Sequence, residues 1–320
     1  ARQDFTFFRR AYFPHYCLVG GDSRLHEWLD AELPRMADAP EGVRLAIAAP
    51  RGEAKSTFVS LFFVLWAVLT GRKHYILIIA DALEQAASLL GAVKDELEFN
   101  EALKRDFPGA GKGHVWNVGT VVTPGNVKIQ ALGAGKRMRG LRHGPHRPDL
   151  IVLDDLENDG NVDKPEQRDK LQSWLQKTVL NLGAADGSMD VVYVGTLLHY
   201  DSVLARTLRK PLWKARTFRS ILRWPDRMDL WDEWESLLSS RGEAEARRFY
   251  RQHRAKMEAG AEVSWPASRP LYRLMCLRAE DREAFDSEQQ NDPLSANEAP
   301  FNGCITFWVD RSRDWLLFGA

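Results

Sequence analysis

The stretch that constrains the fold most is residues 44–66. It has the sequence R-L-A-I-A-A-P-R-G-E-A-K-S-T-F-V-S-L-F-F-V-L-W, in which a short apolar run, a loop and a long apolar segment follow one another. The first run (45–48) is typical of a buried strand, and the segment after Thr57 is typical of a helix. A strand, a loop, Lys-Ser and a helix in this order are the plan of a phosphate-binding loop, in which backbone N–H groups and the helix dipole face the phosphates.

In such a loop Lys55 would reach the β- and γ-phosphates, and the hydroxyl of Ser56 would bind Mg²⁺. The consensus G-x-x-x-x-G-K-[ST] has glycines where this chain has Ala49 and Ala54, so Gly52 is the one glycine left in the loop. An ordinary buried strand–turn–helix is therefore an alternative. The residues expected to contact nucleotide are Pro50, Arg51, Gly52, Glu53, Ala54, Lys55, Ser56 and Thr57.

A second element, residues 149–157, supports the phosphate loop. Its sequence D-L-I-V-L-D-D-L-E is an apolar run that ends in two adjacent carboxylates, about 100 residues after Lys55. In nucleoside triphosphatases the last Asp of such a strand holds Mg²⁺ and the next acid orients the attacking water. By itself the run could be a strand that leads into a surface loop, but together the two elements predict a nucleotide-hydrolysing site.

Strands and helices alternate around these two motifs. Buried strands are expected at 75–80 and 190–195, hairpin-like strands at 121–123 and 127–131, and an edge strand at 213–220. Helices are expected at 23–33, 58–69, 82–99, 164–180 and 200–208. Alternation of this kind predicts an α/β fold with a mostly parallel, doubly wound sheet, and a site at the carboxyl ends of its strands.

The pattern changes along the chain. Residues 1–42 form an aromatic and then helical segment, which either stacks an adenine or covers the core, and residues 43–220 form the α/β core. From 221 to 300 strands disappear, and helices at 229–239, 243–259 and 278–290 indicate a small helical lid or linker subdomain. No apolar run approaches the roughly 20 residues that span a membrane.

The net charge is zero, but basic residues are unevenly distributed. Residues 107–148 contain no Asp or Glu, and residues 206–256 contain fourteen Lys or Arg against seven acids. Such stretches can bind polyphosphates, although the second is at least as well explained by solvated helix faces. The basic residues of the first stretch are Lys112, Lys128, Lys136, Arg137, Arg139, Arg142 and Arg147.

With these motifs placed, the chain resembles the large terminase subunit of tailed bacteriophages, the motor that packages DNA. The resemblance covers nearly the whole chain, and its most specific segments are A-P-R-G-E-A-K-S-T, L-I-V-L-D-D-L-E, V-G-T-L-L-H-Y-D and F-D-S-E-Q-Q-N-D-P. It implies the N-terminal ATPase domain of that subunit, with a P-loop NTPase fold of the RecA-like type, and ATP and Mg²⁺ as ligands.

The resemblance also implies roles for single residues. Asp154 would complete the Mg²⁺ site begun by Ser56, and Arg51 matches an arginine that stabilises or senses the γ-phosphate. The family usually has Glu as its catalytic acid, directly after the metal-binding Asp. Here Asp155 takes that position, and Glu157 is the substitute. Gly195-Thr196 matches the motif that couples hydrolysis to movement. Arg139 is the first candidate for an arginine finger that completes a neighbouring subunit's site, and Arg137 and Arg142 are the next candidates.

The same resemblance implies the partners. They are double-stranded DNA, the portal protein of the procapsid, the small terminase subunit and further copies of the chain. The chain is expected to be a monomer alone and to form a ring, a pentamer, when assembled. The expected location is the portal of the procapsid in the host cytoplasm. The acids needed by a nuclease domain are missing, so residues 301–320 are expected to begin a connection to a nuclease domain absent from this chain, and no nuclease activity is expected. The alternatives are another P-loop ATPase acting on nucleic acid, such as a helicase, and a nucleotide-binding protein that does not hydrolyse.

Overall fold

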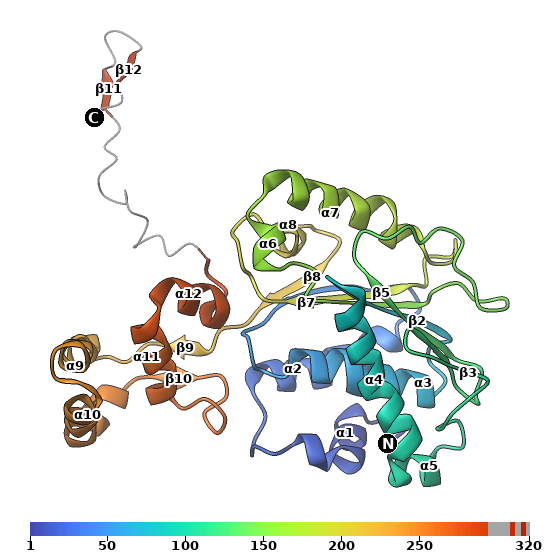
Figure 1. The fold of residues 1–320 in the computed structure, drawn as a ribbon, viewed down its shortest axis with the longest axis horizontal. Coiled ribbons are helices and arrows are strands. Elements are labelled where there is room, and N and C mark those ends of the chain that lie inside the picture. Colours follow the sequence, from blue (N-terminus) through green and yellow to red (C-terminus); the bar gives the residue numbers. More distant parts are fainter. Residues whose placement is uncertain (294–307, 311–314, 318–320) are drawn as a thin grey trace.

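An eight-stranded sheet runs through the centre of the α/β part of the chain (Figure 1). The computed structural model describes residues 1–293, 308–310 and 315–317. The strand order is β3-β4-β5-β2-β6-β7-β1-β8. Neighbouring strands are parallel throughout the part β5-β2-β6-β7-β1-β8. Their bounds are β1 (Arg44–Ala48), β2 (Tyr75–Ala80), β3 (Val115–Trp116), β4 (Thr120–Val122), β5 (Lys128–Gly133), β6 (Leu150–Asp154), β7 (Asp190–Gly195) and β8 (Lys214–Thr217).

The central strands are apolar because both faces of the sheet are covered. In β1, Leu45 and Ile47 belong to the core on one face, whereas Ala46 and Ala48 belong to the core on the other. The predicted antiparallel pairing occurs at one edge, where β4 runs against β3 and β5. The strand predicted for the other edge is β8.

Helices cover the two faces of the sheet (Figure 1). One face carries α1 (Phe5–Tyr12), α2 (Arg24–Ala37), α3 (Val64–Leu69), α4 (Leu83–Phe99) and α5 (Glu101–Asp106). The other face carries α6 (Asp159–Val162), α7 (Pro165–Lys177) and α8 (Val203–Leu208). Short helical turns lie at η1 (Pro14–Tyr16) and η3 (Val179–Asn181). Between the phosphate loop and α3 the chain forms η2 (Thr57–Phe63), whose turns are π-helical, so the single helix predicted at 58–69 is a π segment followed by an α segment.

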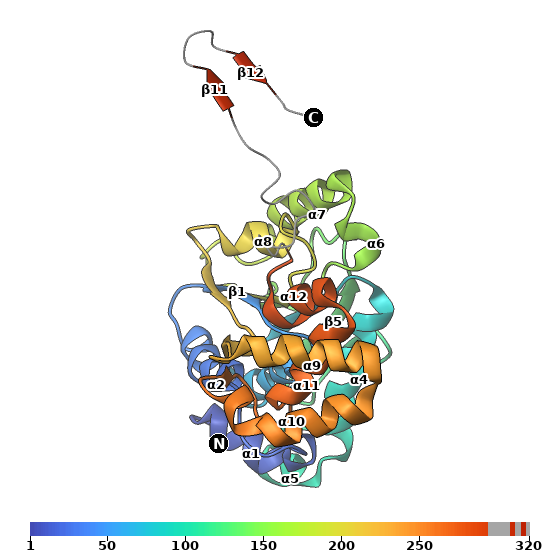
Figure 2. The ribbon, with the colours of Figure 1, turned by 90° about the vertical axis from the view of Figure 1, so that its left-hand side faces the viewer.

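The segment after residue 220 has a hydrophobic core of its own, which includes the buried Trp231, Trp234 and Met257. Around it lie α9 (Met228–Arg241), α10 (Glu243–Glu258), α11 (Leu271–Glu280) and α12 (Arg282–Gln290), and α9 and α10 pack side by side (Figure 2). Two predictions are wrong here. The helix expected at 278–290 is divided at Asp281, which ends α11 and caps α12, and a short antiparallel ladder joins β9 (Ile221–Arg223) to β10 (Glu262–Val263).

The fold-class prediction is confirmed, because the mostly parallel sheet is flanked by helices and followed by a small helical subdomain. Most of the region 301–320, where a connection to a nuclease domain was expected, lies outside the described residues; within it, β11 (Trp308–Asp310) pairs with β12 (Trp315–Leu317). Among the described residues, no helix combines the length and the apolar character needed to cross a bilayer.

Candidate nucleotide-binding and catalytic site

Three sequence-predicted segments meet at one edge of the sheet. Strands β6, β7 and β1 are neighbours, and their carboxyl ends lead into Asp155, Thr196 and the loop from Ala49. The N–H of Ala49 donates to the carbonyl of Gly195 at 2.9 Å, which extends the pairing of β1 and β7 into the loop. The parallel register therefore brings together groups that are up to 147 residues apart in sequence.

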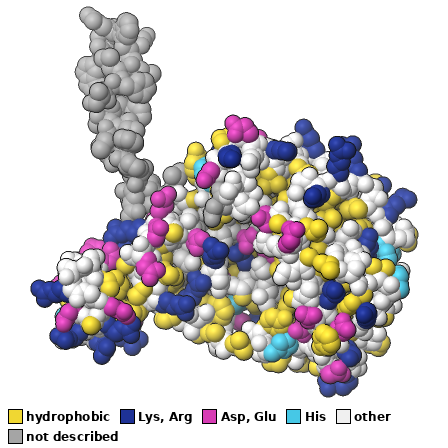
Figure 3. Space-filling view, viewed as in Figure 1, with side chains coloured by type: hydrophobic (Ala, Val, Ile, Leu, Met, Phe, Trp, Pro, Cys, Tyr) yellow, Lys and Arg dark blue, Asp and Glu magenta, His cyan; other side chains and the backbone are white. Residues whose placement is uncertain are grey.

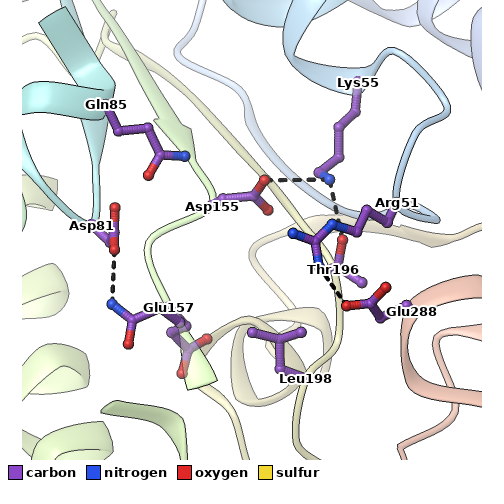
Figure 4. A pocket seen from close by; sticks show the side chains of 10 residues that line it. Arg51, Lys55, Asp81, Gln85, Asp155, Glu157, Thr196, Leu198 and Glu288 are labelled. Atoms are coloured by element: carbon purple, nitrogen blue, oxygen red, sulfur yellow. Dashed lines mark hydrogen bonds and ion pairs between the residues drawn. The ribbon is translucent and has the colours of Figure 1, made fainter. Parts of the chain in front are cut away.

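Lys55 links the three segments. Its side chain is buried, and its Nζ lies 3.3 Å from a carboxylate oxygen of Asp155 and donates to Oγ1 of Thr196 at 3.1 Å (Figure 4). The hydroxyl of Thr196 in turn donates to the carbonyl of Ala49 at 3.3 Å. Lys55 thus contacts both the acid after β6 and the hydroxyl after β7, as expected of a lysine placed to bind a phosphate between them.

Ser56 and Asp154 are joined in a second cluster. The Ser56 hydroxyl donates to Oδ1 of Asp154 at 2.9 Å, and Ser60, one helical turn later, donates to Oδ2. Burial, and then the neighbouring Asp155, raise the pKa of Asp154 to about 6. A fully buried carboxylate beside a hydroxyl is the oxygen ligand set that suits Mg²⁺, which takes few protein ligands and completes its shell with water and phosphate oxygens. The residues present therefore fit the ion.

The predicted phosphate loop contains two residues with a positive φ. Gly52 and Ala54 have φ values of 79° and 55°, so an alanine occupies the left-handed conformation at the second consensus position. For a residue with a Cβ this conformation costs about 1–2 kcal/mol. Asp155 also has a positive φ, 46°, and a Cβ at position 195 would lie 3.3 Å from its Oδ1, so Gly195 allows a close approach to the acid.

Glu157, the substitute candidate for the catalytic acid, binds the N-terminus of α8. Its carboxylate accepts from the N–H groups of Val203 and Leu204 at 2.7 and 3.1 Å, and from the hydroxyl of Tyr193 at 3.3 Å. It therefore binds the first N–H groups of α8, which lack partners within the helix. Burial raises the pKa of Glu157, although these hydrogen bonds oppose the rise. Of the two acids, Asp155 contacts Lys55 and Glu157 supports α8.

Two residues of the predicted loop contact the helical subdomain. The guanidinium of Arg51 pairs with Glu288 on α12 at 2.5 Å, and the N–H of Arg51 donates to the carbonyl of Glu288 at 2.9 Å. The side chain of Glu53 is buried, and Ser264 donates to it at 3.3 Å. Burial raises the pKa of Glu53 to about 7. Glu53 can therefore serve a nucleotide only through its backbone, because its carboxyl group lies inside the protein.

A cavity of about 200 Å³ lies over this cluster. Residues that the sequence motifs did not single out contribute to its wall, namely Asn158 before α6, and Asp81 after β2 and Gln85 on α4 (Figure 4). Asp81 could have been predicted, because it follows β2, whose carboxyl end lies at the same edge of the sheet. Ser60, which donates to Asp154, could have been predicted because it lies four residues after Ser56 on the same helix face. The full lining is Arg51, Lys55, Asp81, Gln85, Asp155, Glu157, Asn158, Thr196, Leu198 and Glu288.

A larger cavity of about 520 Å³ lies beside the predicted phosphate loop. Ala54 and Thr57 belong to its lining, as do Tyr16, His26 and Trp265. Of the N-terminal aromatic residues for which an adenine contact was considered, Phe5, Phe8, Phe13 and Tyr12 are buried in the core, where they pack against Phe62, Phe63, Trp66 and Phe107. The aromatic segment therefore packs on η2 and α3, and Tyr16 is the aromatic residue of this segment that lines the cavity.

The two basic stretches differ in their surroundings. In the second stretch many arginines have acidic partners nearby, so that basic and acidic side chains alternate over the surface (Figure 3). In the first stretch Lys136, Arg137 and Arg139 are exposed and form no ion pair with any described residue. Arg139 does not line the cavity above Lys55, so its expected role on a neighbouring subunit stays a prediction.

No family model matches this chain, and no curated protein sequence matches it. Among solved structures, the ATPase domain of the large terminase of Thermus phage P74-26 is 15% identical over 82% of this chain and 92% of that chain, with a TM-score of 0.40. A point mutant of the same domain is 13% identical over 80% of this chain and 90% of that chain, with a TM-score of 0.37. Both are ATPase domains of a phage large terminase.

Proposed function

We propose that this chain is the ATPase motor domain of a viral large terminase, which hydrolyses ATP to move double-stranded DNA into a procapsid. The observation that carries the hydrolase part is the position of Lys55, whose Nζ lies 3.3 Å from Asp155 and 3.1 Å from Thr196. A lysine that can bind phosphate beside an acid that can orient water, at adjacent strand ends, is an arrangement that phosphoryl transfer to water uses.

The residues divide the work as follows. Lys55 binds the β- and γ-phosphate oxygens and offsets the charge that spreads over the γ-phosphoryl group in the transition state. The carboxylate of Asp155 accepts a hydrogen bond from the attacking water and holds it in line with the bond that breaks. Arg51 borders the same cavity and is the cationic side chain placed to contact the γ-phosphate after leaving Glu288. Thr196 contacts Lys55 and belongs to the strand end expected to respond when the γ-phosphate is lost.

Mg²⁺, when bound, would neutralise charge on the β- and γ-oxygens. Ser56 and Asp154 are the residues that would hold it, since their oxygens lie 2.9 Å apart. Ser60 orients the Asp154 carboxylate by its own hydrogen bond. Ser56 directly precedes η2, Ser60 lies on η2 and Asp154 ends β6, so the proposed metal site is built on regular elements of the core.

We assign the cavity of about 520 Å³ to the nucleobase and sugar. Ala54 and Thr57 line it, and these residues flank Lys55 and Ser56 in the sequence, which places the cavity beside the predicted phosphate loop. His26 stacks on Phe58 with ring centroids 4.2 Å apart and meets Trp265 edge to face at 4.8 Å. His26 and Phe58 are buried, so the partly exposed rings of Tyr16 and Trp265 are the ones available to the flat face of a purine.

The motor part of the proposal rests on the sequence motifs and on the exposed basic loop. Residues 134–148 follow β5 and offer Lys136, Arg137, Arg139 and Arg142 to DNA phosphates or to a neighbouring subunit. Contacts of this kind are independent of sequence and weaken with salt. The proposed partners are double-stranded DNA, the portal protein of a procapsid, the small terminase subunit and further copies of this chain in a ring, at the portal in the host cytoplasm.

The first experiment is steady-state ATP hydrolysis at increasing protein concentration, with and without Mg²⁺, for the chain and for Lys55→Ala. We expect Mg²⁺-dependent turnover that rises per subunit with concentration and that Lys55→Ala abolishes. Nucleotide binding without turnover at any concentration, also with procapsids added, would favour the non-hydrolysing alternative, which the alanines at 49 and 54 and Asp at 155 support. Stimulation by single strands rather than by duplex DNA and procapsids would favour a helicase.

A further inference from the structure

A pair of side chains closes the cavity on the side away from the phosphate loop. Nδ2 of Asn158 donates to Oδ2 of Asp81 at 2.8 Å, and both residues line the cavity. Figure 4 shows Asp81 on the same cavity as Asp155. Asp81 follows β2 and Asn158 precedes α6, so the bond joins two elements that leave adjacent strands of the sheet. None of the sequence motifs includes either Asp81 or Asn158.

The turn that carries Asp155 is held at both ends by this pair. At one end the N–H of Asp81 donates to the carbonyl of Asp155 at 3.3 Å, and at the other the Asp81 carboxylate holds the side chain of Asn158. Asn158 is itself fixed, because its Oδ1 accepts from the N–H of Asn161 at 3.0 Å as the N-cap of α6. The remaining oxygen of Asp81 accepts from the N–H of Ala82 at 2.6 Å.

Such bracing is needed because Asp155 has a positive φ of 46°. A non-glycine residue keeps this conformation only where its surroundings fix it, at a cost of order 1–3 kcal/mol. The conformation directs the Asp155 carboxylate toward Lys55, 3.3 Å away. If the turn between residues 155 and 158 relaxed, the acid would move relative to a phosphate held by the loop after β1.

We propose, on the basis of the proposed ATPase function, that Asp81 and Asn158 are positioning residues for hydrolysis: their hydrogen bond holds the 155–158 turn so that Asp155 faces the attacking water. Neither side chain contacts Lys55 or belongs to the loop after β1, so we expect the pair to affect turnover more than nucleotide affinity, although both line the same cavity. A displacement of about 1 Å at a reacting group can lower the rate about 100-fold.

The pair permits a reversal test. Asn158→Asp places two carboxylates where the 2.8 Å hydrogen bond now lies, yet an Asp at 158 can still accept from the N–H of Asn161. Asp81→Asn combined with Asn158→Asp restores the bond with its direction reversed, and an Asn at 81 still accepts from Ala82. Asn161→Asp is the matched control, because it adds the same charge to α6 and keeps an acceptor for the N–H of Asn158.

The measurements are kcat and KM for ATP, the Kd for a fluorescent ATP analogue, and the melting temperature. We expect Asn158→Asp to lower kcat at least tenfold with KM and Kd within about twofold of the unaltered chain, the double variant to recover most of the loss, and the control to keep the original kcat. Equal losses in single and double variants, an unchanged kcat in Asn158→Asp, or a loss confined to Kd would overturn the inference alone. No hydrolysis by the unaltered chain would overturn the proposed function and the inference with it.

Discussion

The Nζ atom of Lys55 lies 3.3 Å from a carboxylate oxygen of Asp155, and this contact joins the phosphate loop to the turn after β6. The adjacent Asp154 is directed to Ser56 and Ser60 instead. Two consecutive carboxylates thus contact different groups, and Asp155, directly after β6, has a positive φ of 46°. The arrangement supports our proposal that Asp154 binds the metal and Asp155 orients the water.

The first prediction concerns Asp155. Asp155→Asn keeps the size of the side chain but cannot accept a proton or hold the water as a carboxylate does, so we expect kcat for ATP to fall about 10²–10⁴-fold. The Kd for nucleotide should stay within a few-fold, since the loop after β1 is unchanged. Single-turnover hydrolysis and equilibrium binding, measured on the same preparation, test both parts.

The second prediction concerns Glu157, which binds the N-terminus of α8 through Val203 and Leu204. Glu157→Ala leaves those N–H groups without their partner, at a cost of about 1–3 kcal/mol in the free energy of unfolding. We expect a lower urea midpoint together with a kcat per folded molecule close to that of the unaltered chain. A large loss of kcat at unchanged stability would transfer the catalytic role from Asp155 to Glu157.

Much of the site could be predicted from the sequence, because strand ends in a parallel sheet meet at one edge. The segments at Lys55, Asp154 and Thr196 could be placed together on that basis alone. The periodicity of the sequence does not predict which partner each side chain contacts. The use of Glu157 on α8 and the pairing of Arg51 with Glu288 depend on packing between segments distant in sequence. In the same way, Asp281 interrupts a helical pattern that by itself looked continuous.

The third prediction concerns pH and the buried carboxyl group of Glu53, whose pKa burial raises from 4.5 to about 7. The folded chain holds this proton more tightly than the unfolded chain does, so the contribution to stability is complete below pH 4.5 and is lost as pH rises toward 7. The shift corresponds to on the order of 3 kcal/mol.

Glu53→Gln removes this titration while keeping a neutral hydrogen-bonding group beside Ser264. We therefore expect the melting temperature of the unaltered chain, minus that of the variant, to decrease from pH 5 to pH 8. Glu27→Gln, at a half-exposed position on α2, is the control and should show a small and constant difference. A difference for Glu53→Gln that is constant or increases with pH would contradict the assignment.

The fourth prediction concerns the two missing glycines of the phosphate loop. Ala54 has a φ of 55°, so Ala54→Gly relieves about 1–2 kcal/mol of strain and loses about 0.4–1 kcal/mol through the more flexible unfolded chain. The free energy of unfolding should rise by roughly 0–1.5 kcal/mol. Ala49→Gly is the matched comparison; Ala49 is buried without a positive φ, so the substitution should only destabilise. Urea unfolding of both variants distinguishes these outcomes.

The last prediction concerns Arg139, which is exposed in the basic loop and does not line the cavity above Lys55. If it completes a neighbour's site, Arg139→Ala should lower kcat at high protein concentration by up to about 10³-fold, as loss of an arginine finger does. Arg137→Ala and Arg142→Ala should have smaller effects.

The decisive measurement for Arg139 is complementation between two inactive variants. Lys55→Ala has no functional phosphate loop but keeps its Arg139, whereas Arg139→Ala keeps an intact loop and lacks the arginine. When the two are mixed, some Arg139→Ala subunits gain a neighbour that supplies the arginine, so ATP hydrolysis should reappear and increase with total concentration. Arg139→Ala mixed with a Lys55→Ala, Arg139→Ala double variant is the control and should stay inactive. If hydrolysis does not reappear in the first mixture, or if Arg139→Ala alone hydrolyses ATP at the original rate, then Arg139 does not act across subunits.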